Sequence, residues 1–234
     1  MSWLVRLSGN EEALELLRKK YSRPDLAIEY REGNYWLRSV AFDLDITWQE
    51  IYEKGEELIV FLNSVLNLYT LRTGEIQSKG YFQLDAKGNI ENKFIGVYGS
   101  REILSIRLVT VSDDLPDENI FDLFTSYSNV RYVLEMLSQK RLDWYALFSV
   151  YETIASDSEV LKCFRSFDQA LKDWDKFSEK GRFLGTAGWH RHSQFGNTKG
   201  KVNRPPKTPM KLVEAENFVR GLTIEWLSFK ASKA

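Results

Sequence analysis

The chain has 234 residues, a formal net charge of −1, 43% hydrophobic residues and 28% charged residues. This length can bury a substantial core, and the composition excludes disordered and collagen-like proteins. The single cysteine, Cys163, cannot form an intramolecular disulfide, and the first residues carry neither a basic segment nor an apolar one that would make a signal peptide. We therefore expect a cytoplasmic protein, and the absence of any run of 18 apolar residues predicts no membrane span.

Residues 1–112 predict a domain of mixed strands and helices. Apolar residues at helical spacing between Glu11 and Tyr21 predict a helix that ends before Pro24. Short apolar segments predict strands at Ser2–Leu7, Leu26–Arg31 and Tyr35–Val40, the last two flanking a Glu-Gly-Asn turn typical of a hairpin.

A long helix is predicted next, because Thr47 and Glu50 form a capping-box pattern before an apolar stripe that continues to about Tyr69. Gly55 lies inside this segment and argues against an unbroken helix. From Glu75 to Val111 the period changes to that of strands, with turns at Asp85–Asn89 and Gly99-Ser100. We expect a three-stranded meander that packs against the long helix.

The acidic stretch 112–118 interrupts these patterns and marks a domain boundary. Residues 119–234 then predict a helical bundle with helices at Asn129–Gln139, Leu142–Ile154, Ser158–Lys180 and Leu212–Phe229. Glycines and prolines predict a long loop over Gly181–Pro209. The fold class predicted is α+β, with an N-terminal mixed domain followed by a C-terminal helical bundle.

The stretch Gly181–Val213 differs from the rest of the chain in charge. It contains no acid and has a local formal charge of +7, which leaves −8 on the remaining residues. It also contains both histidines, His190 and His192. A basic, histidine-bearing stretch in an otherwise acidic protein is the expected place for an anionic ligand.

Three interpretations of the cluster Trp189–His192 compete. Two imidazoles are too few for a zinc site, and the only thiol, Cys163, belongs to an otherwise apolar segment, so neither a metal nor a cofactor is expected. A histidine beside Arg191 could bind a phosphate and move a proton. Alternatively, Trp189 packs into the bundle and its charged neighbours are merely solvated.

Further basic residues continue through Lys199–Lys211. They could neutralise a nucleic-acid backbone, or they could form a solvated loop. No aromatic residue interleaves with them, and Phe195 is the only one nearby, so sequence-specific recognition is not expected. The residues expected to bind an anionic substrate are Arg182, His190, Lys199, Lys201 and Arg204.

The C-terminal half resembles bacterial HEPN-like proteins in three runs: DWYALFSVYETIASD from Asp143, FLGTAGWHRHS from Phe183, and PPKTPMKLVEAENFVRGL from Pro205. The resemblance implies a homodimer formed through the C-terminal helices, with Arg191 and His192 in a shared cleft that cleaves RNA without a metal. It also implies a role in a bacterial defence or toxin system. The expected function is therefore RNA or nucleotide-phosphate binding with metal-independent ribonuclease activity, and the alternative is a non-catalytic dimeric interaction module.

Overall fold

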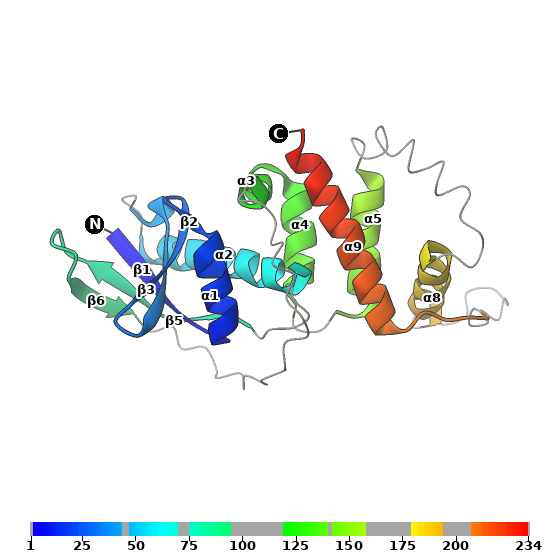
Figure 1. The fold of residues 1–234 in the computed structure, drawn as a ribbon, viewed down its shortest axis with the longest axis horizontal. Coiled ribbons are helices and arrows are strands. Elements are labelled where there is room, and N and C mark those ends of the chain that lie inside the picture. The colour runs from blue at the N-terminus through cyan, green and yellow to red at the C-terminus, as the bar shows by residue number, and fades with distance from the viewer. Residues whose placement is uncertain are drawn as a thin grey trace. The chain divides into compact units, whose positions relative to one another are not determined.

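The computed structural model describes residues 2–43, 47–69, 75–94, 119–139, 142–157, 179–193 and 207–233. The chain divides into two compact units, Met1–Asp122 and Leu123–Ala234. The first holds an antiparallel sheet with helices, and the described part of the second is helical (Figure 1). The α+β fold class predicted from the sequence is confirmed.

A six-stranded antiparallel sheet forms the centre of the first unit. Its order is β2-β3-β4-β1-β5-β6, so the N-terminal strand pairs with β4 on one side and β5 on the other. The strands are β1 (Ser2–Ser8), β2 (Ser22–Arg23), β3 (Leu26–Arg31), β4 (Asn34–Arg38), β5 (Gln77–Leu84) and β6 (Ile90–Phe94). The third strand of the expected meander and the boundary at 112–118 lie outside the described residues.

The hairpin between β3 and β4 turns as the sequence predicts. Glu32 and Gly33 have φ angles of 50° and 75°, the pair of left-handed residues that a two-residue turn requires when its twist matches that of the strands. The side-chain amide of Asn34 donates a hydrogen bond to the Glu32 backbone carbonyl at 2.9 Å. This turn fixes the register in which Tyr30 faces Tyr35.

Helix α1 (Glu11–Lys20) begins at Asn10, whose side chain accepts a hydrogen bond from the Ala13 N–H. A short 3-10 helix, η1 (Val40–Phe42), follows β4. Helix α2 (Trp48–Tyr69) begins with the predicted capping box: the Thr47 N–H donates to Glu50 at 2.7 Å and the Glu50 N–H donates to Thr47 Oγ1 at 3.3 Å. The helix continues through Gly55 without a break.

Side chains of the first unit pack on both faces of the sheet. Trp3 of β1 meets Trp48 of α2, with ring centroids 5.7 Å apart, which places α2 on that face. Because alternate residues of a strand point to opposite faces, Leu4 lies on the other one, where it joins a second apolar cluster with Trp36, Phe82 and Leu84.

The described helices of the second unit are α4 (Ser128–Leu137), α5 (Trp144–Ser156), α8 (Glu179–Ser193) and α9 (Leu212–Ala231), and α3 (Asn119–Ser126) runs across the division between the units. The periodicity predicted α4, α5 and α9 to within a few residues. The sequence did not predict α3. Most of the helix expected at Ser158–Lys180 lies outside the described residues.

Residues 181–193 correct the sequence analysis, because they form most of α8 where a loop was predicted. Each glycine in a helix costs about 1 kcal/mol relative to alanine, which is why the glycines suggested a break. Phe183, Thr186 and Ala187, however, are spaced to share one helix face and are 0–1% exposed. Burial of that face offsets the cost of the glycines.

Candidate functional site

The structure places two of the predicted binding residues, Arg182 and His190, on α8. Arg191 and His192 follow in the last turn of the same helix, and their side chains lie outside the described part of the structure. Lys199, Lys201 and Arg204 also lie outside it. The described part of the candidate site is therefore carried by a helix rather than by the predicted loop.

His190 is held by two indole rings. Its imidazole stacks on Trp144 with ring centroids 5.0 Å apart and an interplanar angle of 11°, and it meets Trp189 nearly edge-on at 4.6 Å. All three side chains are half-buried. A neighbouring ring in the first turn of α5, that of Tyr145, is 64% exposed.

Helix α5 places Trp144 at this position through its own N-terminal cap. The Asp143 carboxylate accepts a hydrogen bond of 2.8 Å from the Ala146 N–H, which fixes the first turn of the helix. Trp144 also contacts Phe183, the fully buried aromatic residue of α8, at 6.1 Å between ring centroids. Phe183, and not Trp189, fills the core at this end of the unit.

Arg182 pairs with a carboxylate at the start of α9. Its Nη2 atom lies 2.9 Å from Glu214 Oε2, and the same carboxylate oxygen accepts the Lys211 N–H at 3.0 Å. The Lys211 N–H, followed by the charge of Arg182, holds the pKa of Glu214 below its usual value. Arg182 and His190 are eight residues apart, which is roughly 12 Å along a helix, so the structure does not bring these two side chains together.

Chemically, this end of the second unit offers the aromatic rings of Trp144, Tyr145 and His190. Indole and phenol rings can stack on nucleotide bases, and arginine or lysine can neutralise the phosphates. The sequence alone indicates the cations but not the site roles of Trp144, Tyr145 and Glu214. The aromatic pair after Asp143 is visible in the sequence, but nothing local indicates that it meets a histidine 46 positions later.

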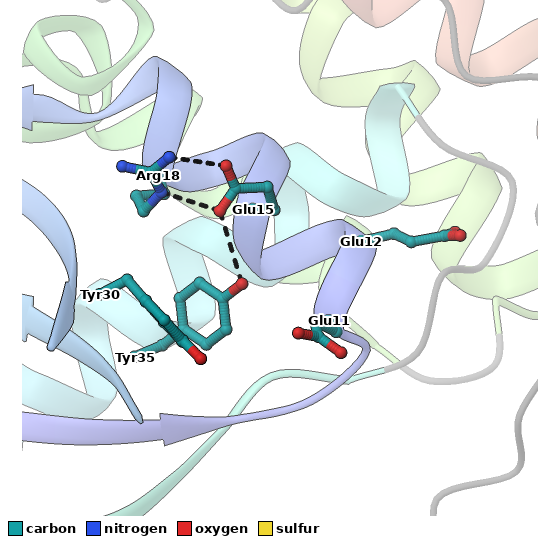
Figure 2. Close-up of a pocket in the computed structure, with 6 residues that line it drawn as sticks. All are labelled: Glu11, Glu12, Glu15, Arg18, Tyr30 and Tyr35. Carbon is teal, nitrogen blue, oxygen red and sulfur yellow. Dashed lines mark hydrogen bonds and ion pairs between the residues drawn. The ribbon is translucent and has the colours of Figure 1, made fainter. Parts of the chain in front are cut away.

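A shallow pocket of about 550 Å³ lies in the first unit, between α1 and the β3–β4 hairpin (Figure 2). The residues that line it are Glu11, Glu12, Glu15, Arg18, Tyr30 and Tyr35. Arg18 donates two hydrogen bonds to Glu15 at 2.7 and 2.8 Å, and Glu11 and Glu12 occupy the first turn of α1, where the helix dipole favours carboxylates. Stabilisation of helix α1 therefore explains the presence of Glu11, Glu12 and Glu15.

Within the described residues, no group of three or more histidine, cysteine, aspartate or glutamate side chains is placed to hold a metal ion. Nor does any helix in that part of the chain have the length and apolar character needed to cross a membrane.

Comparison with known proteins found no matching protein-family model, no matching curated protein and no matching solved structure. The resemblance to HEPN-like proteins therefore stays a prediction based on the sequence runs.

Proposed function

We propose that the chain binds RNA or a nucleotide phosphate at the C-terminal end of α8. The observation that carries this proposal is the stack of His190 on Trp144, because it presents ring faces at the end of the helix from which the acid-free basic stretch continues. Cations combined with exposed rings are the usual elements of single-strand recognition.

Tyr145 offers a further and more exposed ring in the first turn of α5. It is 64% exposed on the first turn of α5, next in sequence to the ring that holds His190. Stacking on such a ring tolerates any base, so we expect a preference for unpaired strands and little dependence on sequence.

Binding is tested by measuring the affinity of the full chain for a labelled single-stranded RNA over a range of salt concentrations. We expect the logarithm of the affinity to fall linearly with that of salt, by about 0.7 for each phosphate contacted. Tyr145→Ala should lower the affinity by about 10-fold, the usual scale for a lost base stack. Tyr132→Ala is the control, because it removes a comparably exposed tyrosine from α4. Wild-type protein without salt-dependent affinity for RNA would overturn the proposal.

We further propose that the chain cleaves RNA without a metal, and this part of the proposal rests on the HEPN resemblance. In it, Arg191 holds the scissile phosphate and His192 is the general acid or base. Cleavage should then proceed with a chelator present, and His192→Ala should lower turnover by about 100-fold or more while leaving RNA affinity nearly unchanged. Arg191→Ala should weaken both binding and turnover. Cleavage that survives His192→Ala would contradict the assignment.

A non-catalytic dimeric interaction module is the second candidate. It is favoured by exposed apolar side chains on the helical unit, namely Tyr132, Tyr145, Leu212 and Val213, which are 37–64% exposed. Independently of which function holds, we propose a homodimer through the C-terminal helices and a cytoplasmic location. Light scattering that shows a monomer at micromolar concentration would contradict the dimer.

A further inference from the structure

Two contacts on successive turns of α8 fasten this helix to the start of α9. Arg182 pairs with Glu214 at 2.9 Å, and one turn later Thr186 Oγ1 accepts a hydrogen bond of 2.9 Å from the Met210 N–H. The Thr186 hydroxyl in turn donates to the Arg182 carbonyl at 2.8 Å. The two contacts therefore form one connected hydrogen-bonded set.

The interior of this junction is closely packed. Thr186 is 1% exposed and Met210 is 4% exposed, so their hydrogen bond is shielded from water. Phe183 lies between Arg182 and Thr186 in sequence and packs against Tyr151 of α5 and Phe218 of α9, with ring centroids 5.4 and 5.2 Å apart. A buried N–H that loses its acceptor has no water to replace it, so this junction has one preferred arrangement.

The junction also fixes the part of α8 that leads to the His190 stack. Helix α8 ends at Ser193. The Met210 N–H donates a hydrogen bond to Thr186, which lies one turn before His190.

We infer that Arg182, Thr186 and Glu214 form a clamp that positions the proposed nucleotide site, and that Arg182 is a positioning residue rather than a phosphate ligand. This inference rests on the proposed function only for its effect on RNA. Arg182 is 29% exposed in its side chain, its guanidinium already bonds a carboxylate, and it lies two turns from the His190 stack.

The two roles of Arg182 predict opposite effects of Glu214→Gln on RNA affinity. A glutamine retains an oxygen that can accept the Lys211 N–H, so the start of α9 is preserved while the charge is removed. If Arg182 positions α8, the weakened clamp should lower the affinity by about 3- to 10-fold without changing the salt slope. If Arg182 were a phosphate ligand, its release from Glu214 and the loss of a negative charge would raise the affinity.

The effect of the clamp on α8 is tested without RNA, by measuring the hydrogen–deuterium exchange rates of the α8 amides in the full chain. Glu214→Gln and Thr186→Val should each accelerate exchange in residues 183–192 by about 5-fold or more. Glu225→Gln, which removes an exposed charge from the same helix α9, should change neither exchange nor affinity.

Three results would overturn the inference: unchanged exchange in both clamp variants, faster exchange with unchanged RNA affinity, or tighter RNA binding by Glu214→Gln. Failure of the wild-type chain to bind RNA would instead overturn the proposed function, while the exchange data would still decide whether the clamp exists.

Discussion

Gly55 shows how a single residue in α2 depends on the sheet. A Cβ atom added there would lie 2.6 Å from Tyr81 Cε1 and 2.8 Å from Tyr81 Oη. The glycine thus allows α2 to approach β5 closely. The packing between helix and strand that this approach permits offsets the low helix propensity of glycine.

Gly55→Ala is therefore expected to destabilise the protein, although alanine is the better helix former. The clash with Tyr81 should lower the free energy of unfolding by about 1–3 kcal/mol. Gly221→Ala is the matched control, because nothing lies within 4 Å of the added Cβ in α9, and it should stabilise by about 0.5–1 kcal/mol. Urea denaturation measures both, and a stabilised Gly55→Ala would refute the close approach.

The Tyr81 hydroxyl makes stability depend on pH in the alkaline range. It donates to Glu56 at 2.8 Å, and burial, followed by the charge of Glu56, raises the pKa of Tyr81 well above 10. The unfolded chain loses this proton near pH 10 while the folded chain keeps it, so the stability is present in full below pH 10 and is lost as the pH rises further.

Tyr81→Phe should therefore flatten the fall in the free energy of unfolding above pH 10. At neutral pH the same substitution should cost about 1 kcal/mol, because it removes one hydrogen bond. The check is denaturation at a series of pH values, with Tyr145→Phe as a control for an exposed tyrosine. An unaltered alkaline slope in Tyr81→Phe would contradict this assignment.

At the scale of elements, a buried amide joins α2 to the start of β5. Asn63 is 7% exposed, its Oδ1 atom accepts the Ile76 N–H at 2.7 Å, and its Nδ2 group donates to the Ile76 carbonyl at 2.8 Å. The side chain thereby completes the backbone hydrogen bonding of a residue that immediately precedes the strand.

Asn63→Leu should destabilise the first unit strongly, because it leaves two buried backbone groups without partners at a cost of about 1–3 kcal/mol each. Gln49→Ala, an exposed substitution in the same helix, should stay within about 0.5 kcal/mol of the wild type. Equal unfolding midpoints for the two variants would show that Asn63 does not join these elements.

At the scale of the whole molecule, a buried carboxylate connects the helices of the second unit. Asp157 Oδ2 accepts hydrogen bonds from Asn129 at 2.9 Å and Trp226 at 3.0 Å and forms an ion pair with Lys230 at 2.9 Å. The Asp157 and Lys230 side chains are 5% and 3% exposed. The ammonium also lies 4.5 Å from the centroid of the Tyr127 ring, which adds a cation–π contact.

Lys230→Met should cost about 3–5 kcal/mol, because it removes the cation and leaves a buried carboxylate uncompensated. Adding Asp157→Asn should recover part of that loss, since the remaining side chain is neutral. Lys233→Met, at an exposed position in the following turn, is the control and should have little effect. Additive losses in the double variant, measured by denaturation, would exclude coupling between Asp157 and Lys230.

The elements whose causes are local could be predicted from the sequence. The Thr47–Glu50 box fixes the start of α2, and the Glu32-Gly33 turn fixes the β3–β4 hairpin, because each signal acts over a few residues. Helices α4, α5 and α9 followed from apolar periodicity for the same reason. For the candidate site, the sequence alone identified the acid-free stretch and its histidines.

Only the tertiary structure decided which elements meet. It paired β1 with both β4 and β5, made a helix of residues 181–193, and placed His190 on Trp144 and Arg182 on Glu214. Periodicity shows that a segment has an apolar face but not which distant segment covers it, and burial of such a face outweighs the local preference of its glycines. The side chains around His190 were therefore determined by packing between residues far apart in the chain.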